Sequence, residues 1–160
     1  MKKMCEKKRN NKGFSLVELI VVILIMAVIA VALAPQVMKW VGRSKVSTDR
    51  NNIGQIESAV NAGVADYMAQ NSTAELAGDL KFYISKDGKG LTTEINANYN
   101  SSKEPTDAVI PFIKEAMNSK YPTTQSKADT VFRISITKKG AVTVDVVNTA
   151  GDPIELDNMD

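Results

Sequence analysis

The sequence contains no histidine, and its single cysteine, Cys5, lies near the N-terminus. Histidine is the most common general base and a frequent metal ligand, so its absence removes the usual centre of acid–base and metal chemistry. The chain after Cys5 has no cysteine from which to form a disulfide, so its fold must be held by packing alone. No glycine-rich phosphate loop is present either. We therefore predict that the protein is not an enzyme and has no cofactor or metal site.

The acidic C-terminus leaves one alternative to that prediction. Asp152, Glu155, Asp157 and Asp160 could supply oxygen ligands to a calcium ion. No further pattern around these charges points to a binding loop, and short charged ends are usually solvated. We favour a solvated acidic end over a calcium site.

Polar residues are almost absent from positions 14–34. This run, called the apolar segment below, has 21 residues and is interrupted only by Ser15 and Glu18. As a helix it would measure about 30 Å, roughly the thickness of the hydrocarbon core of a membrane. Residues 1–13 carry six basic side chains against Glu6 alone. We expect this basic end to stay cytoplasmic while the rest of the chain crosses the membrane.

An ordinary secretory signal is one alternative interpretation of this end. Residues 32–34 form an A-x-A motif of the kind that precedes a cleavage site. Pro35 follows directly, however, and its fixed φ and missing N–H would hinder an extended peptide docked in a peptidase. Glu18 also lies inside the apolar region. We therefore expect no cleavage after Ala34.

Glu18 needs an explanation because an unpaired carboxylate in hydrocarbon costs about 2.5 to 3.5 kcal/mol on insertion scales. One alternative is that its side chain reaches the lipid headgroups. Another is that the chain is cut between Gly13 and Phe14, which would create an α-amine one helical turn before Glu18. The amine and the carboxylate could then pair within one helix, or between staggered neighbours whose axial register they would set.

The segment 13–19, with the sequence GFSLVEL, resembles the class III signal of type IV prepilins and of the pseudopilins of type II secretion and competence systems. The resemblance extends over residues 12–34. It implies cleavage between Gly13 and Phe14 by a membrane prepilin peptidase, and N-methylation of the new Phe14 amine. It also implies assembly into a polymer in which Glu18 sets the register.

The function implied by this resemblance is that of a structural subunit of an extracellular type IV pilus, serving adhesion, surface motility or DNA uptake. A pseudopilin of a type II secretion or competence system is the alternative, and a monomeric membrane-anchored binding module is a third. The implied partners are further copies of the chain, the prepilin peptidase, an assembly platform with its ATPase, and minor pilins. The implied location is a single-pass bacterial cell membrane for the precursor and then a surface filament. We expect no specific binding of nucleic acid.

Removal of residues 1–13 would change the charge of the chain. The full sequence has 20 basic and 18 acidic residues. Without the leader, 14 basic and 17 acidic residues remain, for a net charge of −3. Cys5 would leave as well. Many pilins of Gram-negative bacteria carry a C-terminal disulfide loop, so its absence here favours a Gram-positive or pseudopilin-like member.

The helical pattern continues beyond the apolar segment with a different character. Apolar residues now recur at three- and four-residue steps, which indicates an amphipathic helix; they are Ile53, Ile56, Val60, Val64 and Tyr67. We predict one helix from Phe14 to about Ala69, with Pro35 and Gly42 as sites of bending or local melting. The predicted divisions are a cleaved leader at 1–13, an apolar transmembrane or filament-core helix at 14–35, an amphipathic helix at 36–70 and a globular head at 71–160.

The head is predicted to be small and of the α+β class, with its antiparallel sheet packed on the long helix. Two hairpins are expected from alternating apolar residues on either side of turn sequences, one over 80–95 and one over 132–146. Two helices are expected: a short one started by the capping-box spacing at 72–75 and ended at Gly78, and a second over 106–119. The second would be capped by Thr106 or Asp107, with Pro111 delaying or kinking it. Ile154 and Leu156 are expected to add an edge strand, and 96–105 and 120–129 to form surface loops.

Overall fold

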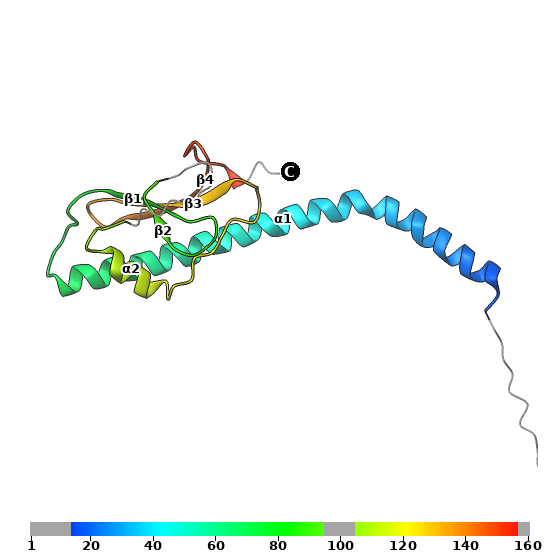
Figure 1. The fold of residues 1–160 in the computed structure, drawn as a ribbon, viewed down its shortest axis with the longest axis horizontal. Helices are drawn as coiled ribbons and strands as arrows, with labels where there is room; N and C mark the ends of the chain where they lie inside the picture. The colour runs from blue at the N-terminus through cyan, green and yellow to red at the C-terminus, as the bar shows by residue number, and fades with distance from the viewer. Residues whose placement is uncertain (1–13, 95–104, 157–160) are drawn as a thin grey trace, which may run out of the picture. The chain divides into compact units, whose positions relative to one another are not determined.

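The computed structural model describes residues 14–94 and 105–156 (Figure 1). Its longest element is helix α1 (Leu16–Gln70). The described chain divides into two compact units, with the boundary inside α1 between Lys39 and Trp40. The predicted helix from Phe14 to Ala69 is therefore confirmed as a single continuous element to within two residues at each end.

The first unit contains only the N-terminal part of α1 among the described residues. Every side chain from Phe14 to Lys39 is exposed. The apolar residues surround the helix on all sides, so no polar face exists to be turned toward water. This part of the chain gains no stability from packing against other described residues.

The second unit, called the head unit below, begins at Trp40 and contains a four-stranded antiparallel sheet. The sheet order is β2-β1-β3-β4. The strands are β1 (Leu80–Ile84), β2 (Leu91–Thr92), β3 (Thr130–Ile136) and β4 (Val142–Asn148). Both predicted hairpins are confirmed within the described residues. Ile95, which was expected to extend the first hairpin, lies outside them.

The long hairpin of β3 and β4 provides most of one face of the core. Residues of the two strands lie opposite one another in an unbroken register, so their apolar side chains share one side of the sheet. The paired residues are Phe132 with Val146, Ile134 with Val144, and Ile136 with Val142. The connecting turn bends back at Gly140, whose φ of +83° favours glycine.

The amphipathic part of α1 covers this apolar face. Ile56, Val60 and Val64 are buried, and Ile53 and Tyr67 are partly buried against the same core cluster. The predicted stripe is therefore confirmed as core. The long helix packed against a small antiparallel sheet gives the α+β fold that was expected (Figure 1).

Helix α2 (Ile110–Ala116) lies beside α1 in the head unit. It is shorter than predicted, and the expected caps are wrong: Val109 is the N-cap residue and makes no side-chain capping bond. Pro111 explains the late start, because proline fits the first turn of a helix, where a backbone N–H has no intrahelical partner. The rings of Tyr67 and Phe112 meet edge to face, with their centroids 5.5 Å apart.

The predicted short helix at 72–78 is wrong. Ser72 takes a left-handed backbone conformation with φ of +49°. The Thr73 hydroxyl donates to the Glu75 carbonyl at 2.7 Å, and this local turn competes with helix formation. The Leu76 N–H then donates at 2.8 Å to a backbone carbonyl in the turn after β3. The segment is therefore a connection tied to the sheet.

The predicted edge strand at Ile154 and Leu156 is also wrong. Only an isolated bridge forms there, between Val147 and Pro153. Two backbone bonds flank it: the Asn148 N–H donates to the Asp152 carbonyl at 3.0 Å, and the Ile154 N–H donates to the Val146 carbonyl at 2.8 Å. Proline has no N–H to continue a ladder, so the pairing stops after one step. The segment before it is held instead by Arg133, whose guanidinium donates to the Gly151 carbonyl at 3.0 Å.

The predicted loop at 120–129 is confirmed as irregular, although it is not simply a surface loop. Asp49 of α1 is fully buried beneath it. One carboxylate oxygen of Asp49 accepts the N–H of Gln125 and the other accepts the N–H of Ser126, both at 2.8 Å. A single side chain therefore fastens the loop to the long helix. The other predicted loop, 96–105, lies almost entirely outside the described residues.

Candidate functional site

The N-terminus of α1 carries the carboxylate singled out from the sequence. Glu18 lies in the first turn of the helix, and its Oε2 accepts the backbone N–H of Ser15 at 2.9 Å. This is half of a capping box, in which a side chain satisfies one of the free N–H groups before a helix. A negative charge at this end also interacts favourably with the helix dipole.

This capping contact was missed in the sequence analysis, although its signal was present. Ser15 and Glu18 have the S-x-x-E spacing directly before an apolar run, which is the expected setting for such a box. The contact shows that the subunit can satisfy Glu18 locally through a backbone donor. It leaves the other carboxylate oxygen with no contact within the described residues.

Phe14 precedes this cap and is 90% exposed. The first helical residue is Leu16, so Phe14 itself lies outside the helix. Gly13, the residue expected on the other side of the cleaved bond, lies outside the described residues. The cleavage site and the methylation of Phe14 therefore stay predictions.

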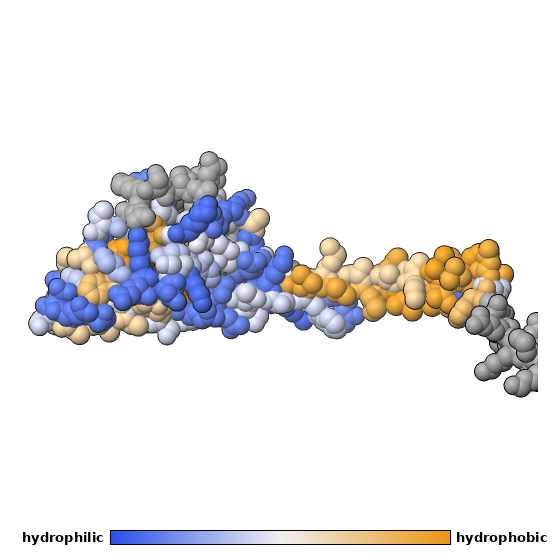
Figure 2. Space-filling view, turned by 60° about the horizontal axis from the view of Figure 1, so that its bottom comes forward, coloured by the Kyte–Doolittle hydropathy of each residue, from blue (hydrophilic) through white to orange (hydrophobic). Residues whose placement is uncertain are grey.

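The apolar segment forms a continuous exposed surface, which appears orange in Figure 2. The helix is long and apolar enough to cross a membrane, and none of the side chains in the most apolar stretch is buried. Large side chains such as Leu24 and Ile29 are each more than half exposed. Soluble proteins rarely present so large an apolar surface to water, so another apolar phase or another chain must cover it.

Pro35 and Gly42, the expected bend sites, both lie inside α1. Pro35 has no N–H to donate to the carbonyl four residues earlier, and Gly42 has no side chain to stabilise the helix. The helix continues through both residues, so the predicted local melting does not occur. Bending at these positions stays a prediction.

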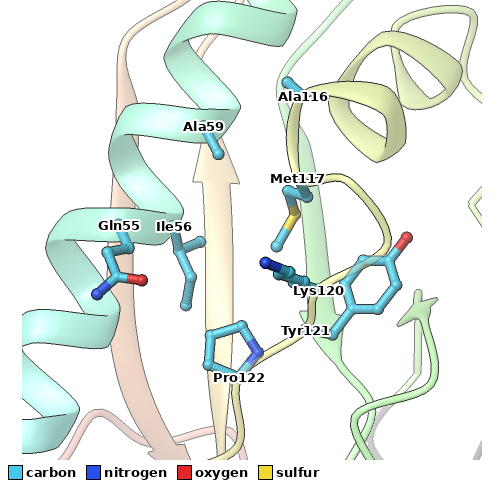
Figure 3. A pocket seen from close by; sticks show the side chains of 8 residues that line it. All are labelled: Gln55, Ile56, Ala59, Ala116, Met117, Lys120, Tyr121 and Pro122. Carbon is cyan, nitrogen blue, oxygen red and sulfur yellow. The ribbon is translucent and has the colours of Figure 1, made fainter.

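A groove of the head unit lies beside α1, lined on one side by Gln55, Ile56 and Ala59 and on the other by Met117, Tyr121 and Pro122 (Figure 3). Its volume is about 420 Å³. The groove contains no cluster of ionisable side chains. Among the described residues, no group of three or more cysteine, aspartate or glutamate side chains could hold a metal ion.

Comparison with known proteins concerns the same end of the chain. A family model described as the prokaryotic N-terminal methylation motif matches residues 8–34. That match contains the whole apolar segment together with Phe14 and Glu18. The N-terminal end of the chain is therefore similar to the signal of type IV pilins and pseudopilins, called the pilin signal below.

Three curated relatives are each similar to part of the chain. A type IV major fimbrial protein of Dichelobacter nodosus is 36% identical over 59 residues, which are 37% of this chain and 38% of the relative. The type II secretion system core protein G of Pseudomonas aeruginosa is 32% identical over 69 residues, 43% of this chain and 49% of the relative. A prepilin peptidase-dependent protein of Clostridium perfringens is 36% identical over 72 residues, 44% of this chain and 51% of the relative.

The chain thus matches about half or less of the length of each of these relatives. No solved structure matches it significantly.

Proposed function

We propose that this protein is a structural subunit of an extracellular type IV pilus, made as a membrane-anchored precursor and polymerised through the apolar segment. The observation that carries the proposal is the exposed apolar helix that begins with the pilin signal. Its surface fits two successive surroundings: lipid in the precursor, and the helices of other subunits in a filament. The head unit, whose surface is largely hydrophilic in Figure 2, would be displayed to the solvent.

The charge at Glu18 supports polymerisation in a defined register. Exchange of lipid for other apolar helices gives little hydrophobic gain, because both surroundings are apolar. Specific polar contacts must therefore decide how the helices align. After cleavage between Gly13 and Phe14, the new amine of one subunit can pair with the Glu18 carboxylate of the next. The Ser15 N–H satisfies that carboxylate until a neighbour arrives.

The small hydrophobic gain on leaving the membrane also supports a need for assembly proteins. A helix must leave the membrane before it joins a filament, and lipid does not drive it out. We therefore propose that an assembly platform with an ATPase supplies the work, after a prepilin peptidase has removed the leader. Minor pilins would share the filament. Adhesion, surface motility and DNA uptake are the uses that such a filament could serve.

Mass spectrometry of the N-terminal peptide tests this proposal. The subunit would be isolated from the native host in two fractions, material sheared from the cell surface and washed membranes. Methylated Phe14 abundant in the sheared fraction is the expected result. An intact leader, or a cut after Ala34, in both fractions would contradict the proposal.

A charge substitution tests the cleavage site itself. Gly13→Lys should leave the leader attached, because a long cationic side chain would replace the small residue before the cut bond. Asn11→Lys adds the same charge two residues earlier and should be processed normally. Normal trimming of the Gly13→Lys chain would refute the proposed site.

A pseudopilin is the second candidate function, favoured by the similarity to core protein G of P. aeruginosa. It would form the same kind of polymer but keep it short, within the cell envelope. The two fractions distinguish the candidates, because a pseudopilin predicts methylated Phe14 confined to the membranes.

A further inference from the structure

A group of cations follows the apolar segment along α1. Lys39, Arg43 and Lys45 are all exposed. The sequence has no acidic residue between positions 19 and 48. None of the three cations forms an ion pair within the part of the chain that the structure describes. Their charges are therefore available to an anionic partner.

The next carboxylate along the helix does not neutralise this group. Asp49 is fully buried, and both of its oxygens accept backbone N–H groups of the loop at 120–129. A carboxylate held in this way is directed into the head unit. The surface of this stretch of α1 keeps a local excess of positive charge.

Trp40 lies among these cations and is 61% exposed. It is the only tryptophan in the chain. Tryptophan is enriched at membrane–water interfaces, where its apolar ring and its polar N–H are both satisfied. Trp40 lies beyond the apolar segment, at the end opposite the basic leader, so a membrane-spanning chain places it on the outer side.

We propose that Trp40, Arg43 and Lys45 form an interfacial anchor that binds anionic phospholipid headgroups on the outer face of the membrane. The long stems of these cations can lie along the acyl chains while their N–H groups reach the headgroup phosphates. This inference rests on the membrane-spanning part of the proposed function.

The anchor adds a step to assembly. Each cation near an anionic surface raises the affinity about fivefold, so Arg43 and Lys45 together give a preference of up to about 25-fold for anionic over neutral lipid. The precursor would be held at a defined depth by this contact. Extraction into a filament would have to break it.

Fluorescence quenching of Trp40 tests the anchor in the full chain. The protein is reconstituted in bilayers of phosphatidylcholine and phosphatidylglycerol, with bromine on the acyl chains of one lipid or of the other. Bromine quenches tryptophan only at short range, so lipid gathered by the basic leader at the opposite face does not contribute. We expect brominated phosphatidylglycerol to quench several-fold more than its mole fraction predicts, and this preference to fall at high salt.

Two double variants with the same change of charge test whether Arg43 and Lys45 cause the preference for phosphatidylglycerol. Arg43→Gln/Lys45→Gln should remove most of the preference, so that brominated phosphatidylglycerol quenches about as much as its mole fraction predicts. Lys120→Gln/Lys139→Gln, which alters exposed lysines elsewhere in the head unit, should leave it unchanged. Equal quenching by the two brominated lipids, or an unaltered preference in the first variant, would overturn the anchor.

The remaining outcomes separate this inference from the proposed function. Quenching by neither lipid would mean that the segment does not insert, and would contradict both. Equal quenching by both lipids would contradict the anchor alone. A shift of Trp40 emission by duplex DNA in detergent that Arg43→Gln/Lys45→Gln abolishes, without any lipid preference, would assign the cations to nucleic-acid phosphates and overturn the proposal.

Discussion

The two parts of α1 use the same secondary structure for opposite purposes. Up to Lys39 the side chains are apolar on all sides and exposed, whereas from Val46 onward a single apolar stripe is buried under the sheet. The difference lies in the spacing of the apolar residues rather than in helix propensity. A continuous apolar surface needs a partner from outside the subunit, and a stripe needs only its own head.

This comparison assigns different consequences to identical substitutions. A change in the stripe should alter the stability of the subunit, because its contacts form on folding. A change in the apolar segment should alter insertion or assembly and leave the head unit as stable as before. The following predictions test that division.

The largest difference in the stability of the head unit is expected between the variants Ile56→Ala and Ile25→Ala. Ile56 is 1% exposed and Ile25 is 53% exposed, in the same helix. Ile56→Ala should destabilise the head unit by about 2 to 5 kcal/mol, because it leaves a cavity in the core. Ile25→Ala should change its stability by less than about 0.5 kcal/mol. Native-state hydrogen exchange of β3 amides in detergent micelles measures both, and equal effects would contradict the division.

Removal of the buried carboxylate should have the next largest effect. Asp49→Ala leaves the N–H groups of Gln125 and Ser126 without their acceptor, which should cost about 2 to 4 kcal/mol. Asp49→Asn keeps one acceptor oxygen and should lose roughly half as much. The same exchange measurement gives both values. An effect of Asp49→Asn equal to that of Asp49→Ala would show that the charge, rather than the bonds, fastens the loop.

The same substitution at two glycines of α1 should change the stability of the head unit in opposite directions. A Cβ at Gly63 would lie 2.8 Å from the Cα of Ile113, whereas one at Gly54 would have no neighbour within 4 Å. Gly63→Ala should destabilise the head unit by about 1 to 3 kcal/mol. Gly54→Ala should stabilise it by about 0.5 to 1 kcal/mol, through helix propensity. Thermal unfolding of the two variants checks this, and stabilisation by Gly63→Ala would mean that α2 can move away.

The smallest effect on stability is expected at the turn between β1 and β2. The Ser85 hydroxyl and the backbone N–H of Lys89 donate to Asp87 and hold the pKa of its carboxyl below the usual 3.8. Because the folded pKa is the lower one, the stabilisation is present above pH 3.8 and is lost as the pH falls through the folded pKa. In Asp87→Ala, a small part of the acid-induced loss of stability should disappear. Urea unfolding of both proteins from pH 6 to pH 3 measures it.

Much of this architecture could be predicted because its signals are periodic. The apolar segment, the stripe on α1 and the strand alternation of β3 and β4 each repeat over several residues, so packing and local preference agree. The pilin signal was equally readable, since it combines a glycine, a carboxylate and an apolar run in a fixed order.

The features that could not be predicted depend on single contacts. Residues 72–75 and the pair Ser15 and Glu18 share the same capping spacing, yet only the second caps a helix. The two segments differ in the sequence that follows. After Glu18 an apolar run continues the helix, whereas after residues 72–75 the Leu76 N–H donates to a carbonyl in the turn after β3. The burial of Asp49 had no local signal, because its partners lie about 75 residues further along the chain.

The central claim, that the exposed half of α1 exists for ordered assembly, is tested most directly at Glu18. Glu18→Gln removes the charge but can still accept the Ser15 N–H, whereas Glu18→Ala removes both. The yield of sheared filaments would be measured for each variant, with Glu115→Ala as the control at an exposed carboxylate of α2. The account predicts that both Glu18 variants are processed and inserted normally yet form no filaments. Normal filaments from Glu18→Gln would contradict it, because helix capping alone would then suffice.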